Sequence, residues 1–169
     1  RVYPALVPQD MMIAKVDGVL NAVEIEADLT GNLLFHGAGA GSLPTTSAVM
    51  ADVVDIARNV ANSVVPPVNL SLSEDIRIRS MLDLETRYYV RLTTTDRPGV
   101  LAQVGAVLGE LNISIASAIQ KEVDDEAQQA EIVLMTHRAS EAAMQQAIQR
   151  LNALDVVAEV GNLIRVEEW

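Results

Sequence analysis

The feature that most constrains the fold is a change of apolar period between residues 84 and 119. Tyr88, Val90 and Leu92 alternate with Tyr89, Arg91 and Thr93, which is typical of a strand with one buried face. After the turn Asp96-Arg97-Pro98-Gly99, apolar residues recur every three or four positions and indicate a helix. This apolar stripe consists of Val100, Leu101, Val104, Val107, Leu108 and Leu111. A period of two returns at Ile113, Ile115, Ser117 and Ile119 and predicts a second strand.

The rest of the chain extends this series. Residues 123–126 are polar and acidic and predict a hairpin tip, and residues 131–137 predict its return strand. A helix is expected from Ser140, which is a good cap and has Glu141 in the first turn. Residues 156–166 predict a last strand. The order βαββαβ predicts an α+β fold of ferredoxin-like type, with an antiparallel sheet and both helices on one face.

The N-terminal part has a different pattern. Strand-like runs at 19–28 and 32–36 are joined by Leu29-Thr30-Gly31, which has hairpin-turn chemistry. A glycine-rich turn follows, and then a predicted helix with the apolar stripe Val49, Val53, Ile56 and Val60. Pro66-Pro67 ends any helix. We therefore expect a first region at 1–63, a linker at 64–83 and a second domain at 84–169.

Composition excludes several classes of function. The formal net charge of −11 disfavours nonspecific binding to nucleic acid or to anionic membranes. No apolar run approaches the roughly 20 residues that a membrane span needs. The chain has no cysteine, and its two histidines, His36 and His137, are far apart, so we expect no metal site. The lack of cysteine is compatible with a cytoplasmic location, which we expect.

Two turns have the chemistry of binding sites. In Asp96-Arg97-Pro98-Gly99, Pro98 suits a first helical turn and Gly99 permits close approach of a ligand. Asp96 either caps the helix or accepts the ammonium group of a ligand, whose carboxylate would suit the helix N-terminus. A free amino acid carries both groups. Gly37, Gly39 and Gly41 form the second turn. They either let the backbone approach a phosphate or nicotinamide group, or only allow a tight turn from strand to helix.

The segments around Asp96 resemble ACT domains, which bind amino acids and regulate the enzyme to which they are joined. The resemblance rests on residues 88–92 (YYVRL), the loop itself and residues 113–122 (ISIASAIQKE). In that family, two copies pair and the effector lies between the loop of one copy and the second strand of the other. The effector-binding residues that this implies are Asp96, Pro98, Gly99, Val100 and Leu101 on one side, and Asn112, Ile113, Ser114 and Ile115 on the other.

Residues 1–62 resemble the end of the catalytic part of homoserine dehydrogenases. The motifs are residues 1–8 (RVYPALVP), 21–23 (NAV), 37–49 (GAGAGSLPTTSAV) and 52–59 (DVVDIARN). The resemblance implies interconversion of aspartate semialdehyde and homoserine with NAD(P), and Gly39 and Gly41 at the cofactor. It places the dinucleotide fingerprint, the catalytic lysine and the substrate carboxylates before Arg1. We therefore expect a C-terminal fragment that has no catalytic residue, binds no cofactor tightly and is inactive alone.

The same resemblance implies L-threonine as the effector and feedback inhibition as its role, with Asn112 or Ser114 beside the threonine hydroxyl. We expect a homodimer or higher oligomer, formed through the ACT domain and the catalytic region. The apolar faces of residues 1–63 would be uncovered in this chain, which predicts dimerisation or partial disorder there. An amino-acid-binding module without a catalytic partner, or a device for dimerisation alone, remains the alternative.

Overall fold

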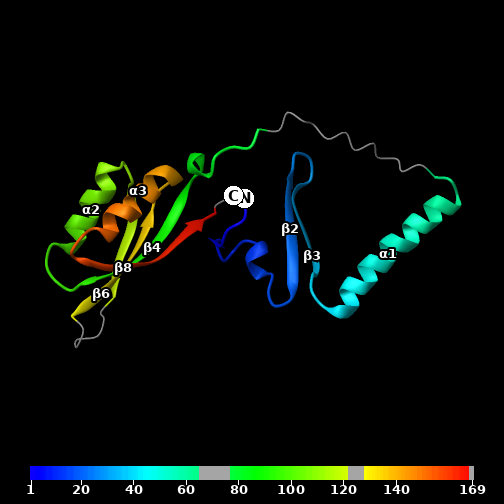
Figure 1. Cartoon of the computed structure of the whole chain (residues 1–169), viewed down its shortest axis with the longest axis horizontal. Helices are drawn as coiled ribbons and strands as arrows, with labels where there is room; N and C mark the ends of the chain where they lie inside the picture. Colours follow the sequence, from blue (N-terminus) through cyan, green and yellow to red (C-terminus); the bar gives the residue numbers. More distant parts are fainter. Residues whose placement is uncertain (65–76, 122–127, 168–169) are drawn as a thin grey trace. The chain divides into compact units, whose positions relative to one another are not determined.

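The chain forms two compact units. The computed structural model describes residues 1–64, 77–121 and 128–167. One unit, the sheet unit, combines Arg1–Val7 with the chain from Ile78 onward, and the other, the hairpin unit, is Pro8–Arg77 (Figure 1). None of the helices that the structure describes is long and apolar enough to cross a membrane.

The sheet unit has the predicted βαββαβ order. Its main elements are β4 (Glu85–Thr95), α2 (Val100–Glu110), β5 (Ile115–Lys121), β6 (Gln129–Thr136), α3 (Glu141–Asn152) and β8 (Val157–Val166). Strand β4 pairs antiparallel with β6 and β8, and β5 pairs antiparallel with β6. A short 3-10 helix, η2 (Met81–Asp83), precedes β4, and β7 (Ala139–Ser140) pairs with its start. The predicted α+β fold is confirmed.

The core of the sheet unit lies between the sheet and the two helices (Figure 1). Tyr88, Val90 and Leu92 on β4 are completely buried, as their alternation predicts. They pack with Val104 and Leu108 of α2 and with Met144 and Leu151 of α3. Burying each valine, leucine or methionine side chain of this core stabilises the fold by about 1.5–3 kcal/mol.

Two apolar residues of the predicted pattern are exposed. Leu101 was assigned to the buried stripe of its helix, but its side chain is 46% exposed. The stripe that faces the sheet is Val100, Val104 and Leu108, spaced by four, and Leu101 lies about 100° around the helix from Val100. Ile119 is also exposed, because a register shift between Ile115 and Ser117 places it opposite Val133, on the less buried face of the sheet.

The helix ends follow from particular residues. The Ser140 hydroxyl accepts a hydrogen bond from the Ala143 amide at 3.2 Å, so the predicted cap of α3 is confirmed. At the C-terminus of α2, Asn112 has the left-handed conformation (φ 55°). Its amide donates to the Gly109 carbonyl at 3.0 Å, and the Ile113 amide donates to the Leu108 carbonyl at 2.9 Å. This pair of bonds is a Schellman motif, in which asparagine is well tolerated.

The hairpin unit contains β2 (Leu20–Ala27), β3 (Gly31–Ala38), α1 (Ser42–Ala61) and a 3-10 helix, η1 (Ile13–Lys15). The two strands pair antiparallel from Leu20 opposite Ala38 to Ala27 opposite Gly31, around the predicted turn. No residue of α1 is buried, and its predicted stripe residues Val49, Val53, Ile56 and Val60 are all more than half exposed. Within the described residues, the apolar face of α1 is therefore uncovered.

The first seven residues lie in the sheet unit and not with the region 1–63 in which the sequence placed them. Strand β1 (Ala5–Leu6) pairs in parallel with β8, with Ala5 opposite Arg165 and Leu6 opposite Val166. An isolated strand pattern does not indicate its partner, which explains the difference. The predicted hairpin tip at 123–126 and most of the predicted linker lie outside the described residues.

Candidate functional site

The loop before α2 leaves the Asp96 carboxylate exposed. The Asp96 amide donates to the Gln128 carbonyl at 2.9 Å, and its Oδ1 accepts from Gln120 Nε2 at 3.3 Å. The capping residue of α2 is Gly99, at φ 90°, and no side chain caps this helix. The alternative in which Asp96 caps the helix is therefore wrong. The sequence suggested that Pro98 lies in the first turn of the helix. Instead, Pro98 precedes the capping residue Gly99.

The second group of predicted effector residues, Asn112, Ile113, Ser114 and Ile115, lies just after the opposite end of α2. This helix has 11 residues and is therefore about 16 Å long. Asn112 and Ser114 are exposed there, whereas Ile113 is buried in the core, as is Val100 at the other end. One chain does not bring the two predicted halves of the site together. A joint site needs two copies, in agreement with the pairing that the ACT resemblance implies.

Thr95 is a residue of this region that the sequence did not single out. Its hydroxyl oxygen is inaccessible to solvent and has no hydrogen-bond partner within the described part of the chain. It directly precedes Asp96, at the end of β4. A buried hydroxyl without a partner costs about 1–3 kcal/mol, so this oxygen favours an additional polar group nearby. A single threonine at a strand end gives no such signal in a sequence.

The glycine-rich turn of the hairpin unit has one position where a side chain would displace a neighbour and one whose backbone conformation requires glycine. A Cβ at Gly39 would overlap the side-chain amide of Asn21. Gly41 precedes α1 at φ 125°, and no side chain caps the helix there. The first N–H groups of α1 are thus free of side-chain partners, which suits one edge of a dinucleotide. In the parts of the chain that the structure describes, no cluster of three or more histidine or acidic residues forms a metal site.

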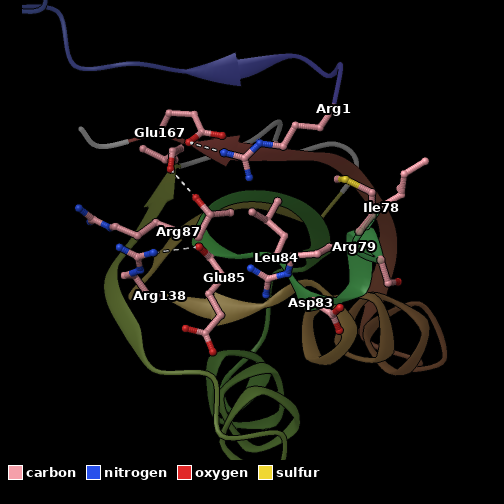
Figure 2. A pocket seen from close by; sticks show the side chains of 13 residues that line it. Arg1, Ile78, Arg79, Asp83, Leu84, Glu85, Arg87, Arg138 and Glu167 are labelled. Atoms are coloured by element: carbon pink, nitrogen blue, oxygen red, sulfur yellow. Dashed lines mark hydrogen bonds and ion pairs between the residues drawn. The ribbon is translucent and has the colours of Figure 1, made fainter. Parts of the chain in front are cut away.

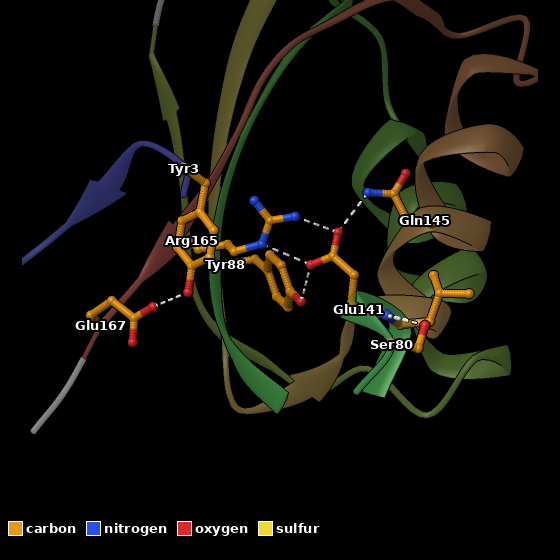
Figure 3. A network of polar contacts seen from close by, with 8 residues as sticks. Tyr3, Ser80, Tyr88, Glu141, Gln145, Arg165 and Glu167 are labelled. Carbon is orange, nitrogen blue, oxygen red and sulfur yellow. Dashed lines mark hydrogen bonds and ion pairs between the residues drawn. The ribbon is translucent and has the colours of Figure 1, made fainter. Parts of the chain in front are cut away.

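A network of polar side chains, also missed by the sequence, joins both ends of the chain to α3 (Figure 3). Glu141 is only 3% exposed. Its carboxylate accepts hydrogen bonds from Arg165 Nε at 2.8 Å, Arg165 Nη2 at 2.6 Å, Tyr88 Oη at 2.8 Å and Gln145 Nε2 at 2.8 Å. The Arg165 guanidinium lies 4.6 Å from the centroid of the Tyr3 ring, and the Tyr3 hydroxyl donates to Glu167.

The network shifts the pKa of Glu141, Arg165 and Tyr88. Burial alone would raise the pKa of Glu141, but the hydrogen bonds from Arg165, Gln145 and Tyr88 outweigh it and hold that pKa below its usual value. The hydrogen bond to Glu141 raises the pKa of Arg165. Burial, followed by the bond to Glu141, raises the pKa of Tyr88 well above its usual value. The pair is therefore ionised, and the tyrosine neutral, at neutral pH.

A pocket of about 850 Å³ lies beside the start of β4 (Figure 2). Figure 2 shows Arg87 and Arg138 on one side of it and Arg79 with Asp83 on the other. Arg138 Nη2 donates to the Glu85 carbonyl at 3.1 Å. None of the predicted effector residues lines this pocket. The part of β4 after Arg87, about 30 Å of extended strand, separates it from Asp96, so it is distinct from the predicted effector site.

In the comparison with known proteins, two family models match separate parts of the chain. A family model described as "ACT domain" matches residues 88–156, and one described as "Homoserine dehydrogenase" matches residues 1–54. The chain is 41% identical to the homoserine dehydrogenase of Neisseria gonorrhoeae and 42% identical to that of Mycobacterium tuberculosis, over 99% of its own length. The chain corresponds to the C-terminal region of homoserine dehydrogenases, including their ACT domain.

A solved structure supports this assignment. The crystal structure of a homoserine dehydrogenase from Thiobacillus denitrificans matches 99% of the chain with a TM-score of 0.84 and 40% identity. The chain spans about two fifths of the curated homoserine dehydrogenases that it matches, 39% of the Neisseria protein and 38% of the Mycobacterium protein. It also covers 38% of the Thiobacillus chain.

Proposed function

We propose that this chain is the regulatory C-terminal portion of a cytoplasmic homoserine dehydrogenase and that its sheet unit binds L-threonine as a feedback inhibitor. The whole protein would interconvert L-aspartate semialdehyde and L-homoserine with NAD(P). The observation that carries the proposal is the exposed Asp96 carboxylate beside the N-terminus of α2, which no side chain caps. Together they offer partners for both charged groups of a free amino acid.

The chemistry of the loop supports an amino-acid ligand. The first N–H groups of a helix have no partner within the helix, and the helix dipole favours a carboxylate there. Asp96 Oδ1 has one bond, to the neutral Gln120 amide, so the carboxylate retains its capacity to accept an ammonium group.

The second half of the site would come from a second copy of the chain. Asn112 and Ser114 are exposed, and the structure records no hydrogen bond for either side chain within its described residues. Either group can pair with the hydroxyl of threonine. Ile113 and Val100 would contribute through their backbone, since their side chains are buried in the core.

The hairpin unit would contribute one border of the NAD(P) site. The cofactor supplies or accepts the hydride in the reaction of the whole protein. Gly39 and Gly41 would let the backbone of the turn approach it, and the N-terminus of α1 would present N–H groups to its polar part. The catalytic residues would come from the rest of the enzyme, so we expect this chain alone to be inactive and to hold no cofactor tightly.

Calorimetric titration of the chain with L-threonine tests the proposal, with L-serine, L-isoleucine and L-methionine as comparators. We expect saturable binding of threonine that Asp96→Asn abolishes. Asn112→Gly keeps the left-handed backbone and removes only the side-chain amide. It should therefore weaken the binding of threonine more than the binding of isoleucine. Glu110→Gln is the matched control, since this carboxylate is exposed and pairs with Arg150 on the same unit. Binding that Asp96→Asn leaves unchanged would contradict the proposed site.

Dimerisation alone is the second candidate function. Strand β5 ends the sheet and pairs only with β6 among the described strands, and Ile119 on it is exposed. Such an edge is suited to pairing with a second copy. A dimer in sedimentation equilibrium, together with no binding of any of the four amino acids, would favour this candidate over the sensor.

A further inference from the structure

Strand β1 connects the sheet unit to the rest of the protein by a second route. It pairs with β8, and the Glu167 amide donates to the Leu6 carbonyl at 2.9 Å. The chain leaves the sheet unit after Val7 and returns at Ile78. The sheet unit is therefore joined covalently to the hairpin unit at two points, and one of them is the end of a strand in the sheet itself.

The pairing of β1 depends on side chains as well as on its backbone. A strand of two residues forms few hydrogen bonds. Tyr3, just before it, places its ring against the Arg165 guanidinium at 4.6 Å and donates its hydroxyl to Glu167 (Figure 3). Arg1 adds a weaker contact to the same ring at 5.8 Å and an ion pair to Glu167 at 3.9 Å. A cation–π contact of this kind contributes about 0.5–2 kcal/mol.

Arg165 is itself held from the opposite side. Its two bonds to the buried Glu141 carboxylate fix the guanidinium plane, since a bidentate pair of this kind is directional. Glu141 is the first residue of α3 and also accepts from Tyr88 on the central strand β4. The far end of β4 carries Thr95 and leads directly to Asp96. A continuous set of packed and hydrogen-bonded groups thus joins the proposed effector loop to β1.

We propose that Tyr3 and Arg165 form a latch that holds β1 on the regulatory sheet and through which effector binding reaches the catalytic part of the enzyme. This inference rests on the proposed function. An effector changes activity only if it binds two states of the protein with different affinity. The two states here are two arrangements of the catalytic part, and latched β1 joins the regulatory sheet to them. Without the latch, the effector still binds the sheet unit but no longer inhibits.

The test compares Tyr3→Ala with Tyr3→Phe, in this chain and in the intact gene product that contains it. Tyr3→Ala removes the ring from Arg165, whereas Tyr3→Phe keeps the ring and loses only the hydroxyl. Both keep the Glu141–Arg165 pair, so neither leaves a buried charge alone. By hydrogen exchange we expect the Glu167 amide to exchange about tenfold faster in Tyr3→Ala, as the loss of a cation–π contact and a hydrogen bond implies. The Tyr3→Phe control should change it less than Tyr3→Ala does, because it loses only the hydrogen bond.

In the intact enzyme, Tyr3→Ala should raise the threonine concentration for half-inhibition about tenfold, again from the loss of those two contacts. We expect kcat without effector, and threonine affinity of the chain in calorimetry, to remain close to those of the unaltered protein. A purely structural role for Tyr3 would lower kcat and melting temperature without separating binding from inhibition.

The outcomes distinguish the inference from the function on which it rests. If the unaltered enzyme is not inhibited by any amino acid, the proposed function fails and the latch fails with it. If the unaltered enzyme is inhibited and Tyr3→Ala is inhibited equally, the proposed function stands and the latch is refuted. Unchanged exchange of the Glu167 amide in Tyr3→Ala also refutes it, because β1 would then not depend on Tyr3.

Discussion

Replacement of Arg165 by methionine should destabilise the sheet unit strongly. Methionine has a similar length and keeps the apolar packing of the arginine stem, so the change isolates the guanidinium. Glu141 would keep its bonds from Tyr88 and Gln145 but lose both bonds from Arg165. Glu141, 3% exposed, would then lose the cation that the structure records beside its carboxylate. The expected result is a large loss in the free energy of unfolding.

The magnitude follows from the geometry. Breaking a buried ion pair by removing one partner costs about 3–5 kcal/mol. The Arg165 side chain is 19% exposed and that of Glu141 4%, so water reaches part of the site and the lower end applies, about 3 kcal/mol. In the double variant Arg165→Met with Glu141→Gln, no charge is buried and the amide still bonds Tyr88. This double variant should recover about 2 kcal/mol relative to Arg165→Met alone.

Urea denaturation followed by near-ultraviolet circular dichroism measures this directly. The three tyrosines, Tyr3, Tyr88 and Tyr89, all lie in the sheet unit, so their signal reports the unfolding of that unit. Tyr3→Ala serves as a control for the contact between Arg165 and the Tyr3 ring, which Arg165→Met also removes. A cost below about 1 kcal/mol for Arg165→Met, or a double variant no more stable than the single one, would refute the reasoning.

Three further predictions concern pH, a turn and a helix end. The pKa of Glu141 is lower in the folded than in the unfolded protein, so its contribution is complete above the unfolded value of about 4.3 and is lost as pH falls through the folded value. The urea concentration at the midpoint of unfolding should therefore decrease as the pH is lowered below about 5. The decrease should be less steep in Glu141→Gln. Gly99→Ala should cost about 1 kcal/mol in urea denaturation because of its φ of 90°, whereas Gly105→Ala, inside α2 and facing open space, should stabilise by about 0.5–1 kcal/mol. Asn112→Ala should cost about 1 kcal/mol and Asn112→Gly almost nothing, and equal costs would contradict the role of the left-handed turn.

The sequence predicted the elements of the sheet unit well because their patterns are local. The alternation at Tyr88, Val90 and Leu92 and the four-residue spacing of Val104 and Leu108 each depend on one element and one buried face. Ser140 was identified as a cap from its position before an apolar stripe, and the structure confirms it. Helix ends and hairpin turns are likewise decided by a few neighbouring residues.

The candidate site was predicted less well. The sequence placed Asp96 at the start of a helix but did not show that Gly99 takes the capping position or that Gln120 bonds the carboxylate. Leu101 fitted the helical stripe, yet only the direction of the sheet decides which side of that stripe is buried. The membership of the predicted effector residues in one site stays a prediction, since it depends on a second copy.

The sequence by itself determined the order of strands and helices in this protein, its two-part organisation and its resemblance to homoserine dehydrogenases. Only the tertiary structure decided that β1 joins the sheet unit and that Glu141 is buried against Arg165. Glu141 and Arg165 are 24 residues apart, Tyr88 and Glu141 are 53 apart, and Tyr3 and Glu167 are 164 apart. No local period relates residues at such separations. They meet because the sheet places β1, β8 and β4 side by side, and because a buried carboxylate is stable only where several donors converge on it.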